Sequence, residues 1–340
     1  MLRVLTYHRI VDPATSPDLL PGLASAAPVE FARQVDFLAR RYRPVSAAQV
    51  LDAKCRGVAL PERAVLVTFD DAYRDFRTVA WPILRARAVP ALLFVPTAFP
   101  DHPERRFWWD RLYRCVTRCQ AAVAASPIGA LPLRSPADRR RSWGRFAAHV
   151  QSLPHDEAMA FVDELCVCLG EATGGAENAG AAAAGQEPRG EVLGWQELRQ
   201  LAREGVTPAP HSRWHPLLTR CSDSRIRDEV RGARADMQEA LGEAPPVFSY
   251  PGGAHDARVR RILAQEGFEL AVTQEDGAND LRTADPLRLR RTDITRRTTL
   301  PILRLRLQPW FGRVDRWRHR ARLAAGDRGR PLLGTTGRPT

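Results

Sequence analysis

The segment "AVLVTFDDAY", residues 64–73, runs from an apolar, β-branched stretch directly into two neighbouring carboxylates, Asp70 and Asp71. Its first six residues are typical of a strand that is buried on both faces of a parallel sheet. Two like charges at the end of such a strand repel each other unless a cation or a shared proton relieves them. A helix N-cap would account for one aspartate, so the pair alone leaves a structural and a functional interpretation open.

Further short apolar runs alternate with stretches of helical periodicity. The runs cover residues 3–8, 91–96, 206–210, 247–250, 269–273 and, more weakly, 287–292. Helical spacing is found over residues 29–42, 76–88, 195–205, 226–241 and 257–268. Strands that alternate with helices predict an α/β fold with a parallel sheet, closed into a barrel or open and doubly wound. In either arrangement ligands bind at the C-terminal ends of the strands.

One region interrupts this alternation. Residues 100–190 contain no strand pattern but three helical stretches, over 108–125, 139–153 and 155–169, and we interpret them as a helical insertion that ends in a flexible, Ala- and Gly-rich linker. The insertion would separate two parts of one α/β unit, residues 1–99 and 191–295. Residues 296–340 would form a basic C-terminal tail.

Composition limits the classes of function. The chain has 340 residues, 44% of them hydrophobic, and a formal net charge of +12 to which only one lysine, Lys54, contributes. The arginines are scattered and no nucleic-acid motif accompanies them, so we expect no nucleic-acid partner. None of the six cysteines has the CxxC spacing of a structural zinc site, and we expect reduced thiols.

The chain has no evident membrane-spanning or export segment. No apolar run approaches the roughly 20 residues of a membrane-spanning helix, and "MLRVLTYHRI" at the start does not resemble a signal peptide. We therefore expect a soluble, cytoplasmic protein. Tryptophans mixed with arginines in residues 309–325 would allow peripheral contact with an anionic membrane.

Two histidines four residues apart, His211 and His215, follow the run that ends near Ala209. Imidazoles at this spacing can bind one metal ion, and one aspartate would complete a set that leaves room for water and substrate. If Asp71 is that ligand, Asp70 is free to accept a proton from water beside the ion. Non-haem iron oxygenases use similar ligands, but on antiparallel β-sandwiches, which the strand and helix alternation disfavours.

Three segments in this order, "TFDDAYRD", "HSRWHP" and "FSYPGG", resemble the polysaccharide deacetylases of carbohydrate esterase family four, the NodB-homology domain. The resemblance covers most of residues 1–295 and implies a distorted (β/α)7-type barrel of parallel strands. It also implies that Asp70 is the catalytic base, that Asp71, His211 and His215 bind the metal, and that the backbone N–H of Tyr250 helps to hold the oxyanion. Ser212 would steady the histidine loop.

Two departures from the family pattern affect the site. The arginine expected two or three residues before Tyr250 is missing, so another group would have to orient Asp70. The late Leu-x-His element is also missing, because the only histidine after residue 260 is His319. However, "LTYHRI" is similar to the N-terminal segment of the poly-N-acetylglucosamine deacetylase branch, which implies that His8 is the general acid.

The resemblance extends to "WWD", residues 108–110, which is found near the groove in some of these enzymes. Trp108 and Trp109 could contact a sugar ring, but paired tryptophans at a helix start are more typical of a core.

Together these features predict a metal-dependent hydrolase that removes N-acetyl groups from amino sugars of a polysaccharide, oligosaccharide or glycolipid. The expected cofactor is a divalent metal, Zn²⁺ first, with Co²⁺ or Ni²⁺ as alternatives. An N-acetylated glycan is the expected substrate. A carbohydrate O-acetyl esterase and a non-catalytic carbohydrate-binding relative remain as alternative functions.

Overall fold

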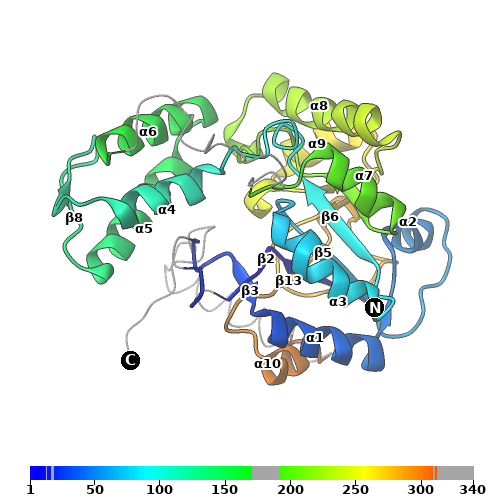
Figure 1. The fold of residues 1–340 in the computed structure, drawn as a ribbon. Helices are drawn as coiled ribbons and strands as arrows, with labels where there is room; N and C mark the ends of the chain where they lie inside the picture. The colour runs from blue at the N-terminus through cyan, green and yellow to red at the C-terminus, as the bar shows by residue number, and fades with distance from the viewer. Residues whose placement is uncertain (13, 17–18, 171–190, 309–310, 312–340) are drawn as a thin grey trace.

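The computed structural model describes residues 1–12, 14–16, 19–170, 191–308 and 311. Strands lie at the centre of the main body and helices surround them (Figure 1). A second group of helices lies to one side of this body and consists of α4 (Trp108–Arg118), α5 (Pro136–Ser152) and α6 (His155–Cys168) (Figure 1).

The largest sheet is almost entirely parallel, and only its edge pair β1–β12 is antiparallel. Its main path is β12 (Ala278–Asn279), β1 (Leu2–Tyr7), β5 (Ala64–Phe69), β6 (Ala91–Val95) and β9 (Thr207–Pro210). In addition, β4 (Arg43–Pro44) pairs with β5, and β13 (Thr292–Asp293) pairs with β1. A separate parallel pair consists of β2 (Arg9–Ile10) and β3 (Ala24–Ala26).

The sheet curves into a ring that two further strands complete. β10 (Val247–Ser249) pairs in parallel with β11 (Leu270–Val272), and Leu289 bridges β11 to the segment that continues into β13 beside β1. Between β9 and β10 no strand pairing occurs among the described residues, so the ring is distorted at this junction. The α/β fold class and the parallel strands predicted from the sequence are confirmed.

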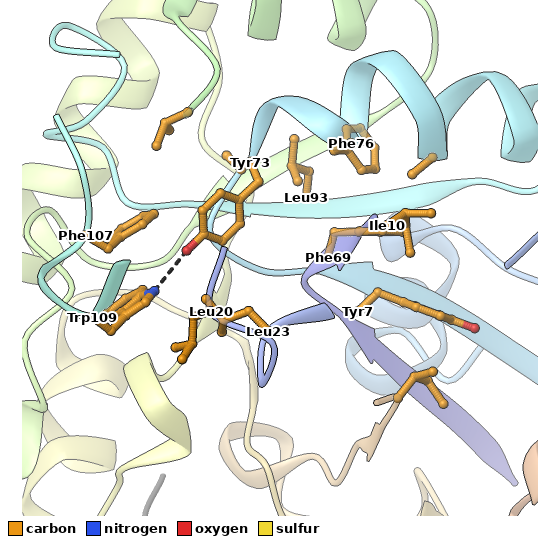
Figure 2. Packing of buried hydrophobic residues seen from close by; sticks show 14 of the residues in the cluster. Tyr7, Ile10, Leu20, Leu23, Phe69, Tyr73, Phe76, Leu93, Phe107 and Trp109 are labelled. Atoms are coloured by element: carbon orange, nitrogen blue, oxygen red, sulfur yellow. Dashed lines mark hydrogen bonds between the residues drawn. The ribbon is translucent and has the colours of Figure 1, made fainter. Parts of the chain in front are cut away.

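Residues of β5 alternate between the two sides of the sheet, as a strand requires. Leu66 belongs to the apolar cluster inside the ring with Phe94 and Val272. Val67 and Phe69 belong to the larger cluster between the sheet and the helices, part of which Figure 2 shows. Every residue of β5 is buried, which confirms the pattern of a strand covered on both faces.

Helices cover the outside of the ring. They are α1 (Pro28–Arg41), α2 (Ala47–Cys55), α3 (Trp81–Arg85), α7 (Trp195–Arg203), α8 (Asp223–Leu241), α9 (Ala257–Gln265) and α10 (Leu300–Arg306), with short 3₁₀ turns η2 (Leu218–Arg220), η3 (Pro251–Gly253) and η4 (Pro286–Arg288). The periodicity did not predict α2, although a capping box between Ser46 and Gln49 marks its start.

The predicted helix over residues 76–88 is shorter and irregular. Its first part is a π-helical turn, η1 (Phe76–Ala80), and only then does α3 begin. Pro82 stands near the start of α3 and has no N–H to donate to the preceding turn. The wider turn accommodates the proline without leaving an ordinary helical hydrogen bond broken.

Between β6 and residue 170 the chain forms α4 (Trp108–Arg118), β7 (Val123–Ala124), β8 (Leu131–Pro132), α5 (Pro136–Ser152) and α6 (His155–Cys168). The prediction of one helix over 108–125 without strands was wrong. The helix ends at Arg118, and β7 pairs antiparallel with β8. The N–H of Leu133 donates to the carbonyl of Ala122, so tertiary pairing overrides the helical tendency of this Ala-rich stretch.

Two predictions fall mainly outside the described residues. The flexible linker was predicted at the end of the insertion, where residues 171–190 lie outside the described part of the chain, and most of the basic tail lies beyond residue 308. Within the described residues, no helix combines the length and apolar character needed to cross a bilayer.

Candidate metal centre

The predicted site residues lie where strands of the ring end. Asp70 and Asp71 follow β5 directly, and His211 follows β9 directly. The chain turns sharply at these points, because Asp71 has φ 73°, Ser212 φ 60° and His215 φ 58°. Non-glycine residues at positive φ are strained and persist only when their surroundings hold them there. These strained residues belong to the two motifs, so the backbone strain is concentrated at the end of the ring where the predicted site residues lie.

Asp71, His211 and His215 come together around one point. Each offers a potential ligand atom, and these atoms all lie within 4.8 Å of one another. Asp71 Oδ1 is 3.6 Å from His211 Nε2 and 3.4 Å from His215 Nε2, and the two imidazole rings are 4.7 Å apart at 82°. One carboxylate and two imidazoles that converge in this way form a three-ligand set with room for further ligands.

The arrangement fits a divalent cation. Asp71 Oδ1 is buried and has no hydrogen-bond partner among the described residues. A buried carboxylate oxygen without a partner is costly unless a cation or a donor compensates it. The ring nitrogen His211 Nδ1 lies 2.7 Å from the carbonyl oxygen of Ser249, to which it donates, so Nε2 is left as the acceptor that faces Asp71.

Both imidazoles are held in the neutral form that binds metals. Burial lowers the pKa of His211 to about 4 and holds the pKa of His215 well below its usual value. Neutral imidazoles can bind a cation without first losing a proton. The hydroxyl of Ser212 accepts the N–H of His215 at 3.0 Å, which agrees with the expected steadying of this loop.

Asp70 is held by an arginine that the sequence did not reveal. Arg291 Nη1 lies 2.7 Å from Asp70 Oδ1, and Arg291 Nη2 lies 2.8 Å from Asp70 Oδ2, with both residues almost completely buried. The guanidinium also donates to the carbonyl of Thr273 at 2.8 Å. The group that was expected to replace the missing arginine before Tyr250 therefore comes from the last segment of the ring.

The two neighbouring aspartates have different environments. Burial by itself raises the pKa of Asp70, but the Arg291 guanidinium outweighs it and holds this pKa well below the usual range. Burial raises the pKa of Asp71 well above its usual value, and the charges of Asp70 and Asp110 raise it further. Asp70 thus keeps its charge without an ion, whereas the charge of Asp71 needs one.

His8 lies at the same end of the ring, in the turn after β1. Its side chain is half-buried, and its backbone N–H donates to Ser25 Oγ at 2.9 Å. The residue before it, Tyr7, pairs with Phe69, and the N–H of Asp70 donates to the Tyr7 carbonyl at 3.0 Å, so His8 and Asp70 follow neighbouring strand ends. Its role as acid stays a prediction.

Tyr250 does not have the free N–H that its predicted role requires. This N–H donates to the carbonyl of Val272 at 3.3 Å, within the pairing of β10 and β11. Its hydroxyl donates to the carbonyl of Leu287 at 2.9 Å, and the residue is fully buried. The structure therefore contradicts the assignment of Tyr250 as an oxyanion donor, because the strand pairing already uses the donor.

The two tryptophans of "WWD" differ. Trp108 is half-buried, whereas Trp109 is 3% exposed and cannot be reached by a sugar ring. Instead, the Trp109 ring lies edge-on to His215, with centroids 4.9 Å apart at 66°. For Trp109 the structural interpretation as a core residue holds, but this core includes a candidate metal ligand.

Comparison with known proteins supports the resemblance to deacetylases. The family model "Polysaccharide deacetylase" matches residues 172–271, a range that contains His211 and His215 but neither aspartate. Over 99 residues the chain is 35% identical to the poly-beta-1,6-N-acetyl-D-glucosamine N-deacetylase of Escherichia coli strain K12. This alignment covers 29% of the chain and only 14% of that relative. The relationship predicted from the motifs is confirmed.

Solved structures share the fold across almost the whole chain. The Streptococcus pyogenes deacetylase PplD in complex with acetate has a TM-score of 0.58 at 17% identity, with 91% of this chain and 98% of that chain covered. IcaB from Ammonifex degensii has a TM-score of 0.56 at 19% identity, with 90% and 97% covered. At these identities the likeness establishes the fold, and the predicted deacetylase-type barrel is confirmed.

Proposed function

We propose that this chain, which carries a polysaccharide deacetylase domain match over residues 172–271, is a metal-dependent hydrolase that removes N-acetyl groups from amino sugars of a glycan. One observation carries the proposal. The buried, unpartnered Asp71 Oδ1 faces the ring nitrogens of His211 and His215, directly beside a second carboxylate, Asp70, that Arg291 holds in its charged form. This set provides a cation site and a separate proton acceptor at one point.

A bound divalent cation, which we propose to be Zn²⁺, would make water more acidic and polarise the acetyl carbonyl. Asp70 then accepts the proton of the attacking water. The pair with Arg291 keeps this carboxylate charged, so it is able to accept a proton. Asp70 Oδ2 accepts bonds from Arg291 Nη2 and from the Ser249 hydroxyl, whereas Oδ1 accepts the bond from Arg291 Nη1 and keeps a lone pair for that proton.

The nitrogen of the sugar must be protonated as its bond to the acetyl carbon breaks, because an amine anion is a very poor leaving group. His8 is the residue that we propose for this step. It lies in the turn after β1, beside the end of β5, where the N–H of Asp70 donates to the carbonyl of Tyr7 at 3.0 Å. Its partial exposure allows it to regain a proton from solvent after each turnover.

The alternative of a non-catalytic carbohydrate-binding relative rested on two missing family residues. Arg291 is paired with Asp70 and can serve the first of these functions, and we propose His8 for the second. A binding protein that had lost its activity would have no need to keep a buried carboxylate charged beside three residues that can bind a metal. The structure therefore favours the enzyme.

The test is acetate release from a panel of N-acetylated oligosaccharides and lipid-linked amino sugars, with metal removed by chelation and then restored. Activity should disappear on chelation and return with Zn²⁺ or Co²⁺. Asp70→Asn should lower turnover by about 10²- to 10⁴-fold, the usual contribution of a general base, while the metal stays bound. Asp36→Asn, which breaks an Asp–Arg pair outside the ring, is the matched control.

Two results would contradict the proposal. Acetate release that survives complete removal of metal would exclude the metal centre as the site of reaction. Turnover by Asp70→Asn near that of Asp36→Asn would exclude Asp70 as the base. Because Asn at position 70 leaves Arg291 without a charged partner, its thermal unfolding and metal content must be measured alongside.

His8→Ala distinguishes amide from ester hydrolysis. An alkoxide leaves more easily than an amine anion, so an O-acetyl esterase depends less on the acid. Loss of acetate release from N-acetyl sugars supports the N-deacetylase, whereas near-normal cleavage of O-acetyl esters by the same variant supports the esterase. The cytoplasmic location and the membrane contact through residues 309–325 stay predictions.

A further inference from the structure

Three buried residues join the helical insertion to the candidate metal centre: Tyr73, Trp109 and Asp110, here called the Tyr73 cluster. The Tyr73 hydroxyl donates to Asp110 Oδ2 at 2.6 Å. It accepts the indole N–H of Trp109 at 2.9 Å, the bond that Figure 2 shows as a dashed line. All three residues are at most 3% exposed. The hydroxyl uses both its donor and an acceptor lone pair, so its position is determined from two sides.

On the insertion side, the cluster reaches one of the candidate ligands. The Trp109 ring lies against the His215 ring at 4.9 Å, Phe107 stacks on it at 4.6 Å and 4°, and Trp108 lies edge-on to it at 5.6 Å. Figure 2 shows Phe107 and Trp109 together at the Tyr73 hydroxyl. The indole is therefore fixed by stacking and by a hydrogen bond, and it limits where the His215 imidazole can lie.

On the barrel side, Tyr73 is two residues from another candidate ligand, Asp71. The carbonyl of Ala72, between them, accepts the N–H of Leu193 at 2.9 Å. The guanidinium of Arg9 lies over the Tyr73 ring at 4.3 Å. The turn that presents Asp71 is thus tied to the same side chain whose hydroxyl holds Trp109.

The loop before His215 is held through its backbone, because Glu229 Oε2 accepts the N–H groups of Arg213 and Trp214 at 2.9 Å each. These bonds fix the path of the loop, whereas the His215 ring itself is bounded by aromatic side chains, Trp109 among them. A ligand ring that can rotate loses affinity for the metal, because side-chain freedom must be given up on binding. The Trp109 indole, which is itself held rigidly, restricts rotation of the His215 ring before the metal binds.

We propose that the Tyr73 cluster positions His215 relative to Asp71, so that the start of α4 in the insertion is part of the metal centre. Tyr73, Trp109 and Asp110 are positioning residues and do not touch substrate. The inference rests on the metal centre of the proposed function and not on the identity of the substrate or the reaction.

The test measures Co²⁺ binding by titration of the metal-free protein, with the visible absorption of the bound ion as a second readout. Tyr73→Phe removes the hydroxyl, and Trp109→Phe removes the indole N–H while an aromatic ring remains. Each should weaken Co²⁺ binding by about 10-fold, as loss of an outer partner of a ligand does, and shift the absorption bands.

The chain offers a matched control for each variant. Tyr7→Phe removes a buried hydroxyl that donates to Gln34 Oε1 at 3.0 Å and points away from Tyr73 (Figure 2). Trp81→Phe removes an indole N–H that donates to Glu204 Oε2 at 2.7 Å. Both controls should keep Co²⁺ affinity within about twofold of the parent and leave the bands unchanged, even where thermal stability falls as much as in the test variants.

The inference would be overturned if both test variants bound Co²⁺ with the affinity and the absorption bands of the wild-type protein. An equal loss of Co²⁺ affinity in the control variants would overturn it as well. These outcomes are separate from failure of the proposed function. If the parent protein binds Co²⁺ and the test variants bind it weakly, the inference stands even when no acetate is released. If the parent protein binds no Co²⁺ at all, both the metal centre and this inference fall.

Discussion

The imidazole of His211 donates to the carbonyl of Ser249 across 2.7 Å, and this bond spans the junction where β9 and β10 form no strand pairing. The orientation of a candidate metal ligand therefore depends on a bond across the junction of the ring that lacks strand pairing. The bond fixes which ring nitrogen faces Asp71, so the same interaction helps to close the barrel and prepares the site.

Two substitutions of His211 should separate these effects. His211→Asn keeps a donor close to the position of Nδ1, whereas His211→Gln places its amide nearer the position of Nε2. Both should weaken Zn²⁺ binding by more than the 10- to 100-fold that follows loss of an outer partner. Only the Gln variant should also lose about 1 kcal/mol of unfolding free energy through the missing bond to Ser249.

Calorimetric titration and urea unfolding of the metal-free proteins measure the two effects. Equal unfolding free energies for the Asn and Gln variants would show that the bond to Ser249 does not stabilise the ring.

Arg291→Met should destabilise the protein strongly, because it leaves the Asp70 carboxylate buried without its partner. The expected loss is about 3–5 kcal/mol of unfolding free energy. Arg290→Met, whose guanidinium is one-third exposed and 3.8 Å from Glu275, should change it by about 1 kcal/mol or less. Urea unfolding at neutral pH provides the comparison.

Adding Asp70→Asn to Arg291→Met gives the decisive control. If the unpaired charge causes the loss, the double variant should recover part of the stability. A double variant as unstable as Arg291→Met alone would assign the loss to packing instead.

Asp110 should make stability depend on pH. Burial raises its pKa to about 6, although the charge of Arg9 opposes this. The folded state therefore binds the proton more tightly than the unfolded state, whose pKa is about 4, and the unfolding free energy falls as pH rises from about 4 through 6. The loss of unfolding free energy that follows ionisation of Asp110 should reach a limit of roughly 3 kcal/mol, since each pKa unit corresponds to about 1.4 kcal/mol.

Urea unfolding of the metal-free protein and of Asp110→Asn across pH 4–8 measures this contribution as a difference. The stability of the variant relative to the parent should rise with pH. Parallel curves for the two proteins would show that Asp110 does not titrate in this range.

Gly253→Ala should be far more harmful than Gly242→Ala, although both glycines have positive φ, 69° and 81°. A Cβ at Gly253 would lie 2.7 Å from Gln274 Cβ and 2.9 Å from the Gln274 backbone nitrogen, whereas a Cβ at Gly242 meets nothing within 4 Å. The backbone cost of about 1 kcal/mol is common to both, and overpacking at Gly253 should add about 1–3 kcal/mol. Equal shifts in thermal unfolding would refute the close approach.

Parts of this molecule could be predicted from sequence because they depend on local pattern and on one topological rule. The apolar run at residues 64–69 matches β5 residue for residue, since a strand buried on both faces leaves a continuous signal. The motifs with Asp71 and His211 were expected to meet because parallel strands of one sheet end at the same edge. Their donor atoms do meet, within 4.8 Å.

Other parts depend on contacts that no local pattern encodes. Arg291 is one basic residue among 51 lysines and arginines, and nothing in its neighbourhood distinguishes it as buried. The one available signal was its place at the end of the weakest predicted strand, residues 287–292. The N–H of Tyr250 was assigned to the oxyanion because the pairing of β10 with β11, which uses that N–H, could not be seen from the sequence.

The pairing of Asp70 with Arg291 joins residues 221 positions apart along the chain. During synthesis at about 5–20 residues per second, the aspartate leaves the ribosome roughly 11–44 s before the arginine that neutralises it. A nascent chain must therefore hold this carboxylate in water or protonated for that time, and β5 cannot settle into its final surroundings until the last part of the barrel has been translated.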